Sequence, residues 1–455
     1  MDNDTLKKIQ AKVEKNAVGI RVNEAYVEGK NHFILKEVRP KEKPDHRVPV
    51  GLAKMAVDDM TGYAGRPGDR RTLIQKVGAE ENEKDDFIDY IREMEAYNKE
   101  QIETSELYDE SCSQGIAYEI FWPSKAVDLP GNLLTTEYKM VPTESVHLQY
   151  TNEIKPSLEY FVYFSGDKED VLTASVYYPL FREDWTSING QEFVLSETVE
   201  YPFTEPPICV YALNRKQQPL FEAGKPLIDA YDIVMSRSLN EVERFNSLIL
   251  LLGGRSTEDF REALSQGELA IIDKILEDLG PDGKLPSDLP RYLQKDFSGV
   301  TELYENYLNR AYKDYRKVVK VQDIGSDEAV GGNVSGVSQA YKLLGMEFMA
   351  AKIDTYFNQG LEKRLDFYAQ VYNAGTQRID VNDYKAVVKT KRNLPVNILE
   401  IIQGIVQLQG IVSDRTILEY LPEQIVPDVE RELERLKEQE PKNVLELPQP
   451  EESDE

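Results

Sequence analysis

"PLIDAYDIVMSRSLNEVERFNSLILLLGG", residues Pro226–Gly254, is the stretch that decides the fold of this chain. Its apolar residues recur every three or four positions, which predicts an amphipathic helix of about seven turns. The helix is expected to end at Gly253 and Gly254, because glycine suits the left-handed backbone of a helix C-cap. The apolar positions are Leu227, Tyr231, Val234, Val242, Phe245, Ile249 and Leu252.

A second long helix is predicted from Ser298 to about Lys320. Its side chains divide between two faces that lie nearly opposite each other, since successive residues turn by about 100°. The apolar face consists of Tyr304, Leu308, Ala311, Tyr315 and Val318. The other face, called the basic stripe below, consists of Arg310, Lys313, Lys317 and Lys320.

The two helices flank a small unit of mixed character, residues 255–297. This unit contains the strand-like run "ELAIID" and the turn "GPDGKLPSDLP". A short unit between two long helices is unusual for a compact enzyme domain and indicates a small head on a stalk. Amphipathic helices of this length also need partners to cover their apolar faces.

The remaining chain is a mixture of helices and strands. Residues up to about 110 are predicted as helices, with a turn-rich interruption at "GYAGRPGDRR", and residues 115–213 as short antiparallel strands separated by Gly, Pro, Asn and Asp. A third long helical pattern follows from residue 337, with Gly345 and Gly360 as points of bending or close packing. "YKAVVKTKRNLP" is predicted as one more strand. The fold class is therefore α+β.

Composition excludes several function classes. The chain has 455 residues and a formal charge of −27, which argues against a protein that grips nucleic acid through clustered Lys and Arg. Two distant cysteines and three scattered histidines give no disulfide framework and no metal spacing, so neither a metal nor a cofactor is expected. No apolar run approaches the length of a membrane span. The adjacent Asp58 and Asp59 point about 100° apart on a helix, which favours a structural or solvated role over catalysis.

The glycine-rich stretch "SDEAVGGNVSG", residues Ser326–Gly336, runs into the third helical pattern. A phosphate-binding P-loop needs a lysine followed by Ser or Thr after its glycines, and none is present. Asp327 and Glu328 precede the glycines and would repel a phosphate. The stretch is therefore interpreted as a mobile loop and helix start rather than a nucleotide site.

The order of these elements resembles that of the portal proteins of tailed bacteriophages, in the family typical of long-tailed phages of Gram-positive bacteria. Four stretches carry the resemblance over most of the chain. They are "VPVGLAKMAVDDMTGYAGRPG" (Val48–Gly68), the quoted helix at Pro226–Gly254, "SGVSQAYKLLGMEFMAAKIDTYFNQGLEKRLDFY" (Ser335–Tyr368) and "LQGIVSDRTILEYLPEQIVPDVERELERL" (Leu408–Leu436). Each is weak alone, and their order is fairly specific.

The resemblance implies a division of the chain into the parts of a portal subunit. These are a wing of helices and antiparallel sheet (1–224), a first stem helix (225–253), a clip (254–297), a second stem helix (298–322), a tunnel loop (323–336), a long helix that returns to the wing (337–395) and a helical crown (396–440). The acidic, proline-containing tail (441–455) is predicted to be disordered from its composition.

The resemblance also implies a ring, usually of twelve subunits, at one capsid vertex, through which double-stranded DNA is packaged and ejected. The implied partners are the terminase large subunit, the head–tail connector, and the major capsid and scaffolding proteins. The protein is then a virion component, made in the host cytoplasm, without catalysis of its own. Two alternatives stay open: a divergent nucleotide-driven DNA-processing enzyme, and an acidic scaffold or adaptor.

The resemblance places the glycine-rich stretch in the tunnel, where weak contact with passing DNA suits its lack of Lys and Arg. The expected contact residues are Asp327, Glu328, Val330, Gly331, Gly332, Asn333, Val334 and Ser335. The basic stripe could face the lumen, pair with acidic groups of a neighbouring subunit, or simply be solvated. The tyrosines Tyr304, Tyr307, Tyr312 and Tyr315 are expected to pack between subunits rather than to stack on bases.

Overall fold

The computed structural model of the chain describes residues 1–35, 45–78, 85–125, 133–167, 169–251, 297–323, 336–375 and 378–392, with scattered positions between 412 and 435. The chain divides into two compact units. The first comprises Met1–Gly331 and Tyr341–Asn393, and the second comprises Gly332–Ala340 and Leu394–Glu455. The sheets, the core and the sites analysed below belong to the first unit.

The described ranges contain helices of four to 38 residues. They are α1 (Asn3–Val27), α2 (His32–Leu35), α3 (Leu52–Ala64), α4 (Asp86–Tyr97), α5 (Glu100–Gln114), α6 (Lys225–Leu251), α9 (Phe297–Val319) and α11 (Gly336–Asn373). The three long helices predicted from apolar periodicity are α6, α9 and α11. The α+β class is thereby confirmed.

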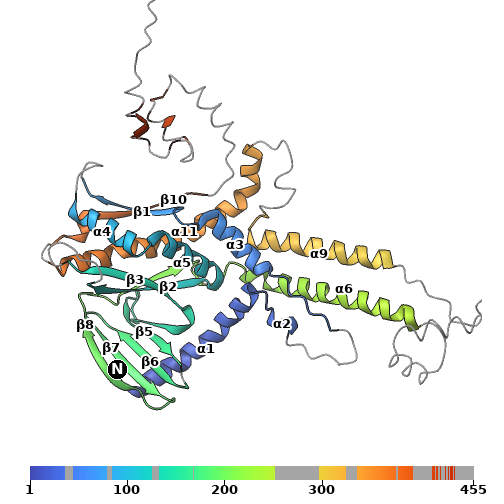
Figure 1. Cartoon of the computed structure of the whole chain (residues 1–455), viewed down its shortest axis with the longest axis horizontal. Coiled ribbons are helices and arrows are strands. Elements are labelled where there is room, and N and C mark those ends of the chain that lie inside the picture. Colours follow the sequence, from blue (N-terminus) through green and yellow to red (C-terminus); the bar gives the residue numbers. More distant parts are fainter. Residues whose placement is uncertain are drawn as a thin grey trace, which may run out of the picture. The chain divides into compact units, whose positions relative to one another are not determined.

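The strands of the described ranges form three antiparallel sheets (Figure 1). Strands β4 (Val146–Tyr150), β5 (Leu158–Gly166), β6 (Val171–Tyr177), β7 (Phe181–Ile188) and β8 (Val194–Glu200) form a meander in that order. A second sheet has the order β3 (Thr135–Val141), β2 (Ile116–Ser124), β9 (Ile208–Ala212). The third is a two-stranded ribbon of β1 (Arg70–Lys76) and β10 (Tyr384–Thr390).

Strand β1 was not predicted, because it begins inside the stretch interpreted as a turn-rich interruption. The turn is real, since the Asp69 N–H donates to the Arg66 carbonyl at 3.0 Å, but the chain becomes extended from Arg70. Its partner β10 is some 300 residues away in the sequence, with Arg70 opposite Thr390. Pairing at that distance leaves no local sequence signal. Strands β3 and β7 were missed as well.

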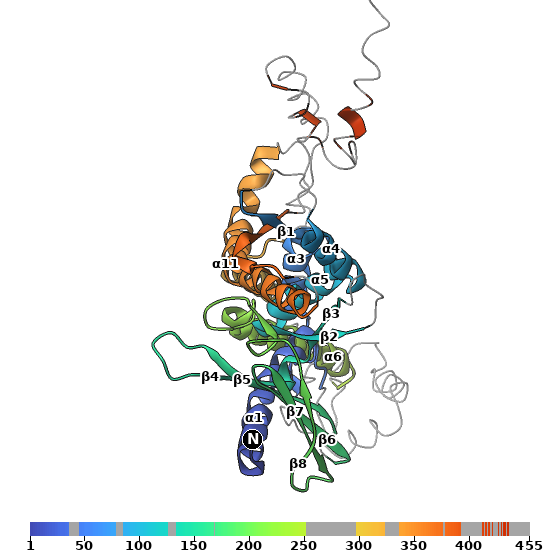
Figure 2. The same cartoon turned by 90° about the vertical axis from the view of Figure 1, so that its left-hand side faces the viewer.

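Two hydrophobic clusters hold the sheets against helices. One face of the five-stranded sheet is covered by α1, whose Leu6, Ile9 and Val13 are buried against Val162 and Val176 (Figure 2). The main core surrounds α11, which contributes buried residues along its whole described side-chain range. Those residues are Met346, Ala350, Ile353, Phe357, Leu361, Leu365, Phe367, Tyr368, Ala369, Val371 and Tyr372.

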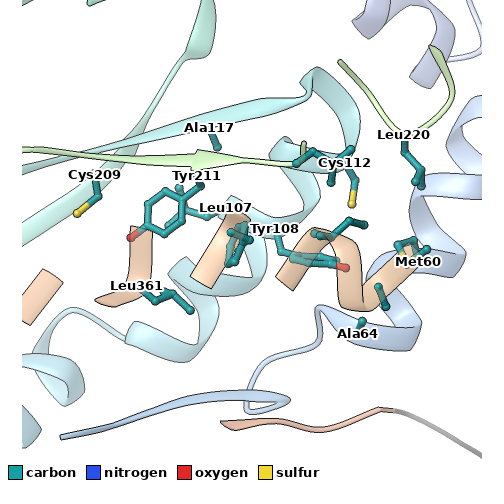
Figure 3. Close-up of a cluster of buried hydrophobic side chains, with 14 of the residues drawn as sticks. Met60, Ala64, Leu107, Tyr108, Cys112, Ala117, Cys209, Tyr211, Leu220 and Leu361 are labelled. Atoms are coloured by element: carbon teal, nitrogen blue, oxygen red, sulfur yellow. The ribbon is translucent and has the colours of Figure 1, made fainter. Parts of the chain in front are cut away.

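The two glycines inside α11 differ in their surroundings. A Cβ atom on Gly360 would lie 2.6 Å from the ring of Tyr211, which is fully buried in the same cluster (Figure 3). Close packing therefore explains Gly360. A Cβ atom on Gly345 would meet nothing within 4 Å, so close packing is the wrong explanation there.

Candidate functional site

The paired long helices are the candidate functional site, and both contact the short turn that precedes α6. Helices α6 and α9 lie side by side (Figure 1). The short turn before α6 contains Gly224, where a Cβ atom would lie 2.6 Å from the ring of Tyr315 on α9. Only glycine at this position lets the Tyr315 ring approach the start of α6 so closely.

Tyr315 fixes the C-terminal part of α9 to the start of α3. Its side chain is fully buried, and its hydroxyl donates to the Leu52 carbonyl at 2.9 Å, where α3 begins. Ala311 and Val319 are buried on the same face, one helical turn to either side. The predicted apolar face was correct for Ala311 and Tyr315. It was wrong for Val318, which is 42% exposed. Val319 lies four residues after Tyr315 and is therefore the one on the buried face.

An ion pair next to Tyr315 adds a second attachment. The Arg316 guanidinium contacts the Asp59 carboxylate of α3 at 2.5 Å and lies over the ring of Tyr312. The Tyr312 hydroxyl donates to Asp323 at 2.6 Å. Tyr315 therefore packs within its own chain, and the expectation that it packs between subunits was wrong. Tyr312 is only partly buried, so its packing between subunits stays a prediction, as it does for Tyr304 and Tyr307. Asp59 has the structural role that the sequence favoured.

Helix α6 carries a row of polar side chains that hold the extended segment 45–50. Asp232, Ser236 and Asn240 follow one another every four residues and are buried. They accept from the backbone N–H groups of Val50 at 2.9 Å, Val48 at 3.0 Å and His46 at 2.7 Å, respectively. Four residues of helix rise by about 6 Å, and two residues of extended chain advance by a similar amount.

This match between the helical and the extended repeat explains why a polar row occupies buried positions of α6. Each side chain satisfies a backbone group that α6 would otherwise leave buried without a partner. The sequence signal was present, as polar residues at a spacing of four, but the matching segment 45–50 has no pattern of its own. Sequence reasoning therefore missed this row.

The basic stripe lies on the outer side of α9. Arg310, Lys313, Lys317 and Lys320 are all exposed. Asp314 lies between Arg310 and Lys317, at 3.6 Å and 3.7 Å, and both pairs are largely in solvent. Exposed pairs of this kind contribute little to stability. The stripe is thus separate from the buried face, as the spacing predicted.

The other predicted site residues lie outside the described residues. They are Asp327, Glu328, Val330, Gly331, Gly332, Asn333, Val334 and Ser335. The same holds for residues 254–296, for the tail 441–455 and for most of 396–440.

A buried ion pair ties α11 to the three-stranded sheet. The Arg364 guanidinium donates to both oxygens of Glu119, at 2.7 Å and 2.9 Å, and both side chains are buried. The Tyr211 hydroxyl donates to the same carboxylate at 2.6 Å, and Arg364 also contacts Glu100 at 3.1 Å. Burial raises the pKa of Glu119, and the Arg364 guanidinium opposes that shift.

A cavity of about 320 Å³ lies between β1, α4 and the start of α5. Glu95 lines it, and burial together with the nearby Glu100 raises the pKa of Glu95 to about 7. A carboxyl whose pKa is higher in the folded than in the unfolded chain stabilises the fold below the unfolded pKa. This contribution is lost as the pH rises through the folded pKa.

We therefore expect Glu95→Gln to be more stable than the wild type at pH 8 and no more stable at pH 4.5. Urea unfolding at both pH values measures the difference. Glu93→Gln on the exposed side of α4 is the control and should change neither value. A Glu95→Gln variant with the same gain at both pH values would contradict the assignment.

Comparison with known proteins decides the family. The family model described as "Phage portal protein, SPP1 Gp6-like" matches residues 6–444. The chain belongs to the phage portal protein family.

Two portal proteins of known phages support this. The portal protein of Clostridium phage phiCD119 is 25% identical over 351 residues, covering 72% of each chain. The portal protein of Bacillus phage SPP1 is 25% identical over 427 residues, covering 87% of this chain and 76% of that one. A chain from the neck of an empty GTA particle has 12% identity and a TM-score of 0.37, with 82% of this chain and 90% of that chain covered. That likeness is too distant to support a conclusion about the fold.

The resemblance drawn from the four sequence stretches is therefore confirmed, and the chain has a phage portal function. Portal proteins are structural, non-enzymatic components of the phage particle, located at the capsid. Within the described part of this portal protein, every helix is too short or too polar to cross a bilayer. The same residues contain no cluster of acidic, His or Cys side chains arranged for a metal ion.

Proposed function

We propose that copies of this portal protein assemble into a ring, with twelve subunits as the usual number, around a channel for double-stranded DNA. The observation that carries the proposal is the family match over residues 6–444, together with two long helices that flank residues 252–296. The protein acts as a channel without catalysis. Packaging energy comes from a terminase, and the chain has no P-loop lysine with which to bind a nucleotide itself.

The parts of the chain take the roles that the resemblance assigns. Residues 225–253 and 298–322 form the stem, and residues 254–297 form the clip, which meets the terminase large subunit and later the head–tail connector. The glycine-rich loop 323–336 contacts DNA in the tunnel, and residues 396–440 form the crown. The wing meets the capsid and scaffolding proteins. The firm attachment of both α6 and α9 to the wing supports a stem that is held rigidly while DNA passes.

The basic stripe provides a test of this arrangement. We propose that it faces the lumen or a neighbouring subunit, since its cations are exposed and the pairs that Arg310 and Lys317 form with Asp314 are largely in solvent. Lys313→Gln with Lys317→Gln is expected to leave the subunit folded and to lower the amount of DNA packaged per capsid. Lys8→Gln with Lys12→Gln makes the same charge change on α1 and should package normally. Normal packaging by the stripe variant would mean that the stripe is merely solvated.

A further inference from the structure

The ribbon of β1 and β10 has two unlike faces. Its inner face packs on the main core, where Tyr384 is buried and Ile74, Ala386 and Val388 are partly buried. Side chains alternate between the two faces of a strand, so the residues between these point outward. The outward residues, called the ribbon face below, are Arg71, Leu73 and Gln75 of β1 and Lys385, Val387 and Lys389 of β10.

The ribbon face is basic in a chain whose net charge is −27. Arg71, Lys385 and Lys389 are exposed, and the face contains no acidic residue within the two strands. Arg71 lines the cavity described above together with Glu95 and Glu100, and none of the three cations forms an ion pair with residues that the structure describes.

Other cations of the ribbon are paired with carboxylates of the same chain. On the inner face Arg70 contacts Asp354 at 2.6 Å, and Lys76 contacts Asp85 at 3.1 Å near the ribbon's end. The fold thus neutralises these cations with carboxylates of α11 and of the residue before α4. The ribbon face keeps its positive charge, which is the arrangement expected of a surface that binds an external anion.

The pairing register fixes the geometry of this charge. Arg71 lies opposite Lys389, Leu73 opposite Val387, and Gln75 opposite Lys385. Lys385 and Lys389 are four residues apart, which is about 13 Å along an extended strand. The major groove of duplex DNA is about 12 Å wide and admits a two-stranded β-ribbon. Cations at the two ends of such a ribbon can reach the phosphates on both sides of the groove, with the small apolar pair between them.

We propose that the ribbon face contacts the phosphate backbone of duplex DNA without regard to sequence. The proposal rests on the function proposed above, in which this chain surrounds or meets the packaged duplex, and it names a surface for that contact. An acidic protein partner is the competing occupant of a basic face. The groove-sized separation of the charges and the two-stranded ribbon favour DNA.

The test compares binding of the full-length protein to a short fluorescent DNA duplex of mixed sequence over a range of salt concentrations. The logarithm of the association constant falls linearly with the logarithm of the salt concentration, and each phosphate contact steepens this slope by about 0.9. We expect Arg71→Gln, Lys385→Gln and Lys389→Gln together to bind more weakly at low salt and to reduce the steepness of that slope by about 2.7 per subunit.

Two matched variants separate the ribbon face from general effects of charge. Lys7→Gln, Lys8→Gln and Lys12→Gln remove the same charge from exposed positions of α1 and should retain wild-type binding. Arg71→Lys with both lysines changed to arginine keeps the charge and should also retain it. Wild-type slope and affinity in the ribbon variant, or equal losses in the ribbon and α1 variants, would overturn the proposal.

Electron microscopy of the same samples distinguishes failure of the proposal from failure of the proposed function. Rings formed by the ribbon variant, with DNA binding unchanged, would overturn the ribbon contact alone. Loss of rings in the ribbon variant with unchanged DNA binding would assign the face to a protein partner and also overturn the proposal. If the wild type forms no rings, the proposed function fails, whatever the DNA measurements give.

Discussion

Arg364→Met is expected to destabilise the fold by about 3–5 kcal/mol, the usual cost of removing one partner of a buried ion pair. The substitution leaves the Glu119 carboxylate buried, with the Tyr211 hydroxyl as its remaining close partner. Without the opposing guanidinium, burial raises the pKa of Glu119 further. The folded chain then holds this proton more tightly than the unfolded chain, so the loss of stability should be smaller at pH 5 than at pH 8. Urea unfolding at the two pH values measures both effects.

The double variant Arg364→Met, Glu119→Gln provides the control for this interpretation. Glutamine is neutral, and its amide oxygen can still accept from the Tyr211 hydroxyl. We therefore expect the double variant to be more stable at pH 8 than Arg364→Met alone and to lose most of the pH dependence. A double variant that is less stable than both the wild type and Arg364→Met would show that the losses add. The two side chains would then contribute independently, which would contradict the ion-pair account.

Tyr315→Ala is expected to destabilise the chain by about 3–5 kcal/mol, the range for truncating a fully buried aromatic side chain. The ring fills the space beside Gly224, and the hydroxyl satisfies the Leu52 carbonyl. Losing both should release the C-terminal part of α9 from α3. Chemical unfolding measures the stability, and limited proteolysis within 297–319 measures the release of the helix.

Two variants on the same helix test the specificity of this effect. Tyr307→Ala removes a side chain that is 46% exposed and should change stability by no more than about 0.5 kcal/mol. Tyr315→Phe removes only the hydroxyl and should cost about 1 kcal/mol. Equal losses in Tyr307→Ala and Tyr315→Ala would mean that α9 is held by general helix packing rather than by this attachment to the wing.

The sequence predicted the long helices well because their information is local. In α6 and α9 the apolar residues recur at helical spacing, and Ala311 and Tyr315 were correctly placed on the buried face of α9. Most strands between Gly115 and Leu213 were also visible as short apolar runs bounded by turn residues. The family followed from the order of these elements, and the match over residues 6–444 confirms it.

The interactions that attach the long helices to the rest of the first unit could not be predicted, because each joins segments far apart in the chain. The Arg364–Glu119 pair and the Arg316–Asp59 pair have no signal in either segment alone. In the β1–β10 ribbon, β10 was predicted as a strand, but β1 and the pairing of the two were not. Strand β7, "FREDWTSI", is rich in polar residues and becomes a strand by pairing on both sides. The candidate site was likewise predicted in part: the basic stripe is exposed as expected, and its role in the channel stays a prediction.

Negative-stain electron microscopy of the purified full-length protein, with its mass determined by light scattering, tests the central claim most directly. The account predicts closed rings with an axial hole wide enough for a DNA duplex and a mass that is a whole multiple of the subunit mass. Particles that remain monomers or dimers at every concentration, and that hydrolyse a nucleotide in the presence of DNA, would contradict the ring-shaped channel and favour an enzyme.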